Sequence, residues 1–280
     1  MPPTGHIQQV NSVKTRDNLL ISCSNDKTVK LWNLTNQSEI ASLLCDVNSS
    51  AISLPGKKQV LVAEYSLLKL WDSQTGELVK EFRGHTNTIK WFSCSKTGEF
   101  IFSTGWDGKI CKWDLKTGEL LNTLTIGKSI NCAQFIEADK VLLCADWDGV
   151  IHIWDLEQGK EIEQIKLKSF AIRSIALVQQ NKYLIASSED EKLTIWDTKT
   201  WKELDSVKIK AVDQFVLLPY SQKLAVLNNS KEIQIFSIFP LKKVDTINQK
   251  TFPTSIYVQK NEEYLVVGNS NGTIYLYKKK

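Results

Sequence analysis

The stretch GHTNTIKWFSCSKTGEFIFSTGWDGKICKWD, from Gly84 to Asp114, predicts three antiparallel strands in succession. Its first extended run, IKWFSCS, is rich in the β-branched and aromatic residues that favour strands. A turn at KTGE and a second extended run lead to an Asp-Gly pair, which is typical of a two-residue hairpin into KICKWD. A turn at Thr117-Gly118 then precedes an amphipathic run from Leu120 to Leu124. The unit is therefore expected to form one four-stranded sheet.

This sheet would carry apolar side chains on both faces, so it needs a neighbouring sheet on each side. The rest of the chain supplies such neighbours, because the aromatic residue that closes the third strand recurs with spacings of 39, 42, 41, 42, 40 and 41 residues. Seven copies of the unit fill the chain, and their closing aromatics are Trp32, Trp71, Trp113, Trp154, Trp196, Phe236 and Tyr277.

The strings that end at or just after these aromatics are KLWN, KLWD, CKWD, HIWD, TIWD, QIFS and YLYK, so four copies keep an intact Trp-Asp pair. With the period, the Gly-His pair and the Asp-Gly hairpin, they resemble the WD-repeat family of β-propellers over essentially the whole chain. The resemblance implies an all-β fold, a seven-bladed WD-repeat β-propeller that occupies residues 1–280 as a single domain.

The two chain ends bear on how the last blade is completed. In the resembled family the ring usually closes when an amino-terminal strand joins the last blade. Here Met1 to Thr4 precede Gly5, and two of these four residues are prolines, which cannot donate to a sheet ladder. We expect a three-stranded seventh blade with no amino-terminal closing strand and an open edge near Gly272 to Tyr277. The alternative is that the chain is a fragment of a longer protein.

Composition argues against several classes of protein. The 280 residues are 42% apolar, without a Gly/Ser/Pro-rich linker or a long block of one charge, which favours a single compact domain. The amino terminus, MPPTGHIQQV, lacks the regions of a secretory signal, and no apolar run approaches the ~18 residues of a membrane span. We expect a soluble cytoplasmic protein, with the nucleus as the alternative location and no membrane partner.

Six cysteines raise the question of a disulfide framework or a zinc site. No CxxC string occurs, and most of the cysteines fall inside predicted strands, where cysteine packs as a small apolar residue. We therefore expect no structural metal and no cofactor. The cysteines are Cys23, Cys45, Cys94, Cys111, Cys132 and Cys144.

The charge balance disfavours nucleic acid as the partner. The formal net charge is +4, and of 35 basic residues only Arg16, Arg83 and Arg173 are arginines. Recognition of phosphates and base edges favours the arginine fork, so the lysines are more typical of a solubilising surface. Nucleic-acid or ribonucleoprotein binding through the lysine-rich surface stays an alternative, and it predicts binding that weakens steeply with salt.

The first and third units each carry a His, a Ser, an Asp and a Trp at matching positions. A catalytic triad would also need an exposed nucleophile and an oxyanion hole, and no GxSxG string is present, so no catalytic residue is assigned. In the resembled family these side chains form a hydrogen-bonded chain that fixes a blade. The resemblance implies structural tetrads of His6, Ser22, Asp26 and Trp32, and of His85, Ser103, Asp107 and Trp113.

Units three and four carry an additional tryptophan directly before the hairpin aspartate, at Trp106 and Trp147. By resemblance these turns lie on the top face, so the two indoles would lie side by side, as is typical of a binding surface. The alternative is that each ring folds down onto its own blade. With the early first-strand positions that the resemblance places beside them, the predicted partner-binding residues are Lys90, Trp106, Asn131, Trp147 and Arg173.

We therefore expect a non-enzymatic scaffold, part of a multiprotein complex, that binds a protein or peptide on the top face over blades three to five. A basic and aromatic patch suits an acidic or phosphorylated partner. An enzyme that uses the central channel is a further class, but the chain has only His6, His85 and His152 and no predicted inward carboxylate cluster. A propeller fragment of a larger complex subunit also stays open.

Overall fold

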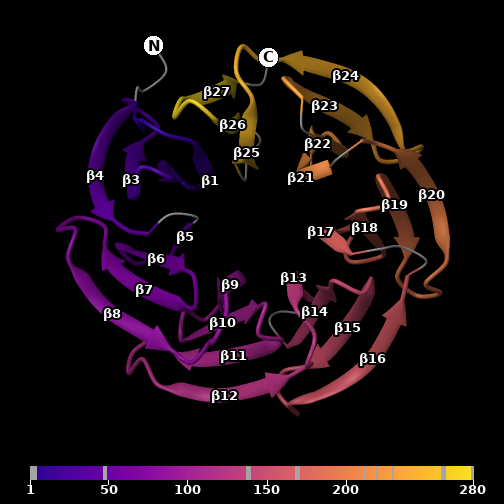
Figure 1. The fold of residues 1–280 in the computed structure, drawn as a ribbon, viewed down its shortest axis with the longest axis horizontal. Coiled ribbons are helices and arrows are strands. Elements are labelled where there is room, and N and C mark those ends of the chain that lie inside the picture. Colours follow the sequence, from indigo (N-terminus) through magenta and orange to yellow (C-terminus); the bar gives the residue numbers. More distant parts are fainter. Residues whose placement is uncertain are drawn as a thin grey trace. The chain divides into compact units, whose positions relative to one another are not determined.

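The computed structural model describes residues 5–46, 49–136, 140–167, 171–210, 212–218, 220–228, 230–259 and 263–278. In these ranges the chain forms 27 strands and no helix. The strands build seven antiparallel sheets that follow one another along the chain (Figure 1). Six sheets have four strands and the last has three. The predicted all-β fold with seven blades and a three-stranded last blade is confirmed.

The first three sheets consist of β1 (Val10–Arg16), β2 (Leu19–Ser24), β3 (Thr28–Asn33) and β4 (Ser38–Leu44); β5 (Ser50–Ser53), β6 (Gln59–Glu64), β7 (Leu67–Asp72) and β8 (Leu78–Arg83); and β9 (Ile89–Cys94), β10 (Phe100–Gly105), β11 (Lys109–Asp114) and β12 (Leu120–Thr125). The fourth and fifth consist of β13 (Ile130–Ile136), β14 (Val141–Asp146), β15 (Val150–Asp155) and β16 (Lys160–Lys166); and β17 (Ile172–Val178), β18 (Tyr183–Ser188), β19 (Lys192–Asp197) and β20 (Glu203–Lys208). The last two consist of β21 (Val212–Leu218), β22 (Lys223–Asn228), β23 (Glu232–Ser237) and β24 (Lys242–Asn248); and β25 (Pro253–Val258), β26 (Tyr264–Asn269) and β27 (Ile274–Lys278).

Several sheets contain a β-bulge near the start of their first strand. The register between the first and second strands shifts at Asn11, Lys90, Asn131, Arg173 and Thr254. A bulged residue has no partner across the ladder, so its side chain can be aimed away from the regular alternation. Three of these bulges therefore decide where the predicted partner-binding residues point.

The contacts divide the chain into two compact units. One comprises Met1–Arg83, Phe215–Ile235 and Val244–Lys280, and the other comprises Gly84–Gln214 and Phe236–Lys243. The prediction of a single domain over residues 1–280 stays a prediction. The predicted lack of an amino-terminal closing strand concerns residues 1–4, which lie outside the described residues.

Within the first unit, side chains of the first and last sheets form one core. Val10 and Val13 pack with Val266 and Ile274. The Thr254 hydroxyl donates to the Val10 carbonyl at 2.6 Å. These two sheets therefore meet through packed side chains and polar contacts, with no strand shared between them among the described residues.

In the second unit, aromatic and branched side chains fill the space between neighbouring sheets. Phe135 on β13 meets Trp91 and Phe102 of the third sheet edge-on, with ring centroids 5.1 and 5.3 Å apart. All six cysteines are free thiols, and burial raises the pKa of Cys111 to about 11. In the described part of the chain, no group of three or more His, Cys, Asp or Glu side chains could hold a metal ion. That part also has no helix long and apolar enough to cross a membrane.

Candidate interaction site

The tetrad of the third sheet forms a continuous hydrogen-bonded chain. Trp113 Nε1 donates to Ser103 Oγ at 2.9 Å, and Ser103 Oγ lies 2.8 Å from His85 Nε2. Burial lowers the pKa of His85, which favours a neutral imidazole. In this form Nδ1 donates to Asp107 at 2.9 Å, and Nε2 accepts the proton of Ser103.

The first sheet repeats this chain. Trp32 Nε1 donates to Ser22 Oγ at 2.9 Å, and His6 lies 2.7 Å from Ser22 Oγ and 2.8 Å from Asp26 Oδ2. Asp26 also accepts from the backbone N–H groups of Ile7 and Thr28, so it ties the hairpin to the segment before β1. A catalytic serine must reach its substrate, whereas Ser22 and its counterpart in the third sheet are fully buried. The geometry of both tetrads is that of a structural clamp.

The fourth sheet uses a different polar cluster in place of a tetrad. His152 is buried, with Nδ1 2.6 Å from Glu161 Oε1 and Nε2 3.3 Å from Asp146 Oδ2. Although burial lowers the pKa of His152, its hydrogen bonds and charges with these two carboxylates give a net rise. The indole N–H groups of Trp154 and Trp196 have no hydrogen-bond partner among the described residues. Sequence reasoning missed this cluster, although Asp146 stands two residues before the hairpin aspartate of that unit.

The two additional tryptophans lie next to each other. The ring centroids of Trp106 and Trp147 are 6.3 Å apart, and the rings are tilted by 60°. Trp106 is half-buried, and its Nε1 donates to Asn131 Oδ1 at 3.2 Å. Trp147 is 43% exposed. One ring is therefore held by a hydrogen bond, and the other offers an apolar surface to solvent.

Asn131 connects three sheets of the second unit. Its side-chain oxygen accepts from Trp106 of the third sheet, and its side-chain nitrogen donates to the Ile172 carbonyl of the fifth sheet at 3.0 Å. The Ser129 hydroxyl also donates to the Trp106 carbonyl at 2.9 Å. Because Asn131 is the bulged residue of β13, its amide can reach both neighbours. These bonds hold the Trp106 ring in one position before any partner arrives.

Lys90, the bulged residue of β9, lies over the Trp106 ring with its ammonium 5.0 Å from the ring centroid. This distance is within cation–π range. Surrounding protein removes part of the water from the ammonium and lowers the pKa of Lys90. Lys90 has no carboxylate partner in the described part of the chain.

Arg173 is paired with two carboxylates. Its guanidinium lies 3.2 Å from Glu189 and 3.4 Å from Asp213. The sequence predicted a basic contribution from Arg173, but two negative charges balance it, so the patch is less basic than expected. Sequence reasoning missed Asp213 as a partner. An alignment of the repeat units could have predicted this pair, because the two residues occupy the same position in adjacent units. Asp213 directly follows the first residue of β21, as Arg173 follows the first residue of β17.

The structure thus brings together Lys90, Trp106, Asn131 and Trp147, and we call these four residues the indole patch. Arg173 belongs to a separate ion-paired group.

Comparison with known proteins shows the family. The family model for the WD domain, G-beta repeat, matches residues 3–33, 76–114, 118–155 and 160–197, which is more than half of the chain. The chain belongs to the WD-repeat family. The matched segments include every strand of the third and fourth sheets, whose repeat units supply the residues of the indole patch.

Several curated relatives match parts of this WD-repeat chain. Autophagy-related protein 16 of Arabidopsis thaliana is 32% identical over 126 residues, which cover 43% of this chain and 25% of that protein. The U3 small nucleolar RNA-associated protein 21 homolog of Schizosaccharomyces pombe is 34% identical over 111 residues, 38% of this chain and 12% of that protein. WD repeat domain-containing protein 83 of Rattus norvegicus is 29% identical over 140 residues, 49% of this chain and 44% of that protein. The matches span less than half the length of each relative.

Proposed function

We propose that this WD-repeat chain is a non-enzymatic scaffold that binds a segment of a protein partner at the indole patch, as part of a multiprotein complex. The observation that carries the proposal is the pair of Trp106 and Trp147, in which a fixed ring supports an exposed one. Exposed indoles that become covered on binding are frequent hot spots, each worth about 2 kcal/mol or more. Membership of a repeat family that displays surfaces for binding supports the same role.

The fixed position of Trp106 makes the patch suitable for binding before a partner arrives. Its N–H is already bonded to Asn131, so a partner covers the ring without leaving a buried donor unsatisfied. A ring that is already ordered also loses little freedom on binding, which leaves more of the contact free energy for affinity. A partner side chain that stacks on Trp147 would gain from this preorganised support.

The charges around the patch define the favoured partner further. Lys90 is the cation next to the indoles, whereas Arg173 already has two carboxylate partners. An acidic or phosphorylated residue of the partner would therefore meet Lys90 while an apolar or aromatic residue packs on Trp147. Glu189 and Asp213 would repel an extended polyanion, which disfavours nucleic acid at this place.

A ribonucleoprotein is the second candidate partner, because one relative is named for association with U3 small nucleolar RNA. Salt separates the two candidates. Binding that falls by orders of magnitude between low and physiological salt would favour nucleic acid. Binding through the indoles and the single cation of Lys90 would weaken far less, because apolar burial is not screened by ions.

An affinity capture experiment tests the proposal and identifies the partner. The tagged chain and the variant Trp106→Ala/Trp147→Ala are used to capture proteins, which are quantified by mass spectrometry. Phe252→Ala is the matched control, because Phe252 is 49% exposed with Lys231 5.0 Å above its ring and lies outside the patch. We expect at least one protein that the wild type and Phe252→Ala retain and the double variant loses. Identical protein sets for all three chains would contradict the proposal.

A further inference from the structure

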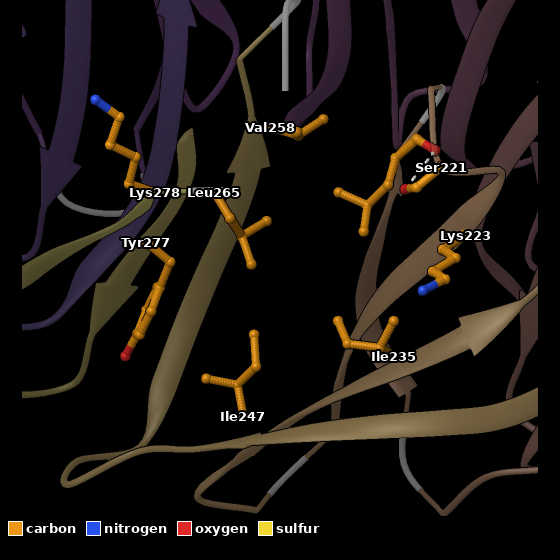
Figure 2. Close-up of a pocket in the computed structure, with 9 residues that line it drawn as sticks. Ser221, Lys223, Ile235, Ile247, Val258, Leu265, Tyr277 and Lys278 are labelled. Carbon is orange, nitrogen blue, oxygen red and sulfur yellow. Dashed lines mark hydrogen bonds between the residues drawn. The ribbon is translucent and has the colours of Figure 1, made fainter. Parts of the chain in front are cut away.

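A surface pocket of about 250 Å³ lies between the last two sheets, within the first compact unit. Its wall on the sixth sheet is formed by Leu218, Ile235 and Ile247, and its wall on the seventh by Val258, Leu265 and Tyr277. Figure 2 shows Leu265 and Ile235 on opposite sides of the pocket, with Ile247 below them in this view. The pocket is thus lined mainly by apolar side chains that no part of the described chain covers.

Between the fourth and fifth sheets, the positions equivalent to those that line the pocket carry similar side chains. Ile153 and Ile235 each precede the closing aromatic, Ile165 and Ile247 each follow it by eleven residues, and Ile136 and Leu218 each end a first strand. On the other wall, Leu184 pairs with Trp196 as Leu265 pairs with Tyr277. The pocket and the equivalent place between the fourth and fifth sheets therefore have matching walls. The side chain that occupies that place indicates which kind of side chain the pocket accepts.

Between the fourth and fifth sheets, Trp201 fills this space. It stands in the turn from β19 to β20 and, like Ile153 and Ile165, packs against a buried cluster that includes Leu184 and Trp196. Beside Tyr277, no side chain of the described residues occupies the equivalent place, and the pocket is found there. The pocket therefore matches the place that a large apolar side chain occupies between the fourth and fifth sheets.

The edge of β27 offers hydrogen bonds to such a strand. Among the described residues β27 pairs with β26 alone, whereas the third strand of every other sheet pairs on both sides. Tyr277 is half-exposed, whereas five of its six counterparts at the closing aromatic position are buried. An unpaired strand edge beside an apolar pocket is the arrangement that binds extended peptides by strand addition.

The rim of the pocket is positively charged. Lys223 and Lys278 both line it, and Lys278 lies 3.6 Å from Glu263. Lys223 has no carboxylate partner in the part of the chain that the structure describes. An acidic residue next to the apolar anchor would therefore find a cation on the sixth sheet.

We infer that an extended segment of a protein partner binds antiparallel along β27, places one aromatic or large aliphatic side chain in this pocket and directs an acidic residue to Lys223. This site is separate from the indole patch, because its residues belong to the other compact unit. The bound partner segment would be the fourth strand of the seventh sheet, as β20 is the fourth strand of the fifth sheet.

The chain itself supplies a probe for this site. A fluorescein-labelled peptide with the sequence of residues 200–208, TWKELDSVK, contains Trp201 and the strand that follows it. We expect this peptide to bind the purified chain saturably in fluorescence anisotropy. Replacing Trp201 by Gly in the peptide should weaken binding at least about tenfold, because the anchor side chain is lost. No binding of the Trp-containing peptide would overturn the proposal.

Two variants of the chain locate the binding. Ile247→Trp fills the pocket from its own wall and should weaken binding at least about tenfold, with an unchanged melting temperature as evidence of folding.

Lys223→Glu is a surface change that does not depend on repacking. A peptide with Lys202→Glu should bind the wild type more tightly than the original peptide, and Lys223→Glu should remove this gain. Lys242→Glu, an exposed lysine of β24 outside the pocket lining, is the matched control and should preserve it.

Equal binding to the wild type and to Ile247→Trp would place the peptide elsewhere and overturn the proposal. The solution mass of the chain distinguishes a second copy from a partner segment. A dimer that Ile247→Trp dissociates would assign the pocket to a second copy of this chain and would also overturn it.

Discussion

Ser103 receives a hydrogen bond from Trp113 and gives one to His85, so its hydroxyl is satisfied in both directions. The same residues could have suggested a hydrolase, since His85 lies 2.8 Å from Ser103 on one side and 2.9 Å from Asp107 on the other. Burial decides between the two interpretations, because Ser103 is inaccessible to a substrate. At the scale of single residues, the tetrads connect a loop, two strands and a hairpin.

Replacing His85 by Ala should lower the free energy of unfolding by about 2 to 3 kcal/mol, because buried polar groups of Ser103 and Asp107 lose their partner. Urea denaturation of the variant measures this change. Lys128→Ala, which removes an exposed ion pair with Asp148, should have almost no effect. If His85→Ala leaves stability intact but abolishes an activity of the protein, the structural assignment of the tetrad is wrong.

His152 and His85 should respond to pH in opposite directions. The pKa of His152 lies above its ordinary value of 6.5, so its stabilising effect is complete below that value and is lost as pH rises through the raised pKa. The pKa of His85 lies below 6.5, so its contribution is present above pH 6.5 and is lost as pH falls through the lowered pKa.

Denaturation of the wild type and of His152→Gln across pH 5 to 8.5 measures the first effect. The difference in unfolding free energy should be largest at low pH and should shrink as pH rises. A difference that stays constant over this range would show that Asp146 and Glu161 do not stabilise a protonated His152.

At the scale of strands, β-bulges explain which predicted residues meet. The repeat period predicted where the strands begin, but the bulge at Asn131 lets one amide bridge Trp106 and Ile172. Replacing Asn131 by Ala should therefore cost about 1 to 2 kcal/mol, from two lost hydrogen bonds. Urea denaturation measures this cost, with Asn122→Ala on the exposed face of β12 as the control. Equal stability of the two variants would argue against the bridge.

The sequence predicted the sheets well because every unit repeats the same strand and turn chemistry, even the last two without their Trp-Asp pairs. The neighbouring indoles were also predictable, because Trp106 and Trp147 occupy one position in adjacent units. The ion pairs of Arg173 were not, because the direction of its side chain depends on the bulge in β17 and one of its partners, Asp213, belongs to the next sheet. The pocket beside Tyr277 was also missed, since it depends on the absence of a filling side chain in the described structure.

At the scale of the whole molecule, the first and last sheets are connected by packing within the first unit. A Cβ added to Gly268 would lie 2.5 Å from Val10 Cγ1 and would also meet Ser255 Oγ. Gly268→Ala should therefore destabilise the chain, and Val10→Ala should relieve part of this clash. The double variant should be more stable than the sum of the single changes by about 1 kcal/mol in urea denaturation. Simple additivity would contradict the described contact between the two sheets.

Binding at the indole patch can be measured directly. Once capture has identified a partner, isothermal titration calorimetry measures its dissociation constant with the wild type, Trp147→Ala and Phe252→Ala. We expect Trp147→Ala to weaken binding at least about tenfold, as is typical of a hot-spot indole, and Phe252→Ala to bind like the wild type. Equal dissociation constants for all three chains would show that the partner binds away from Trp147.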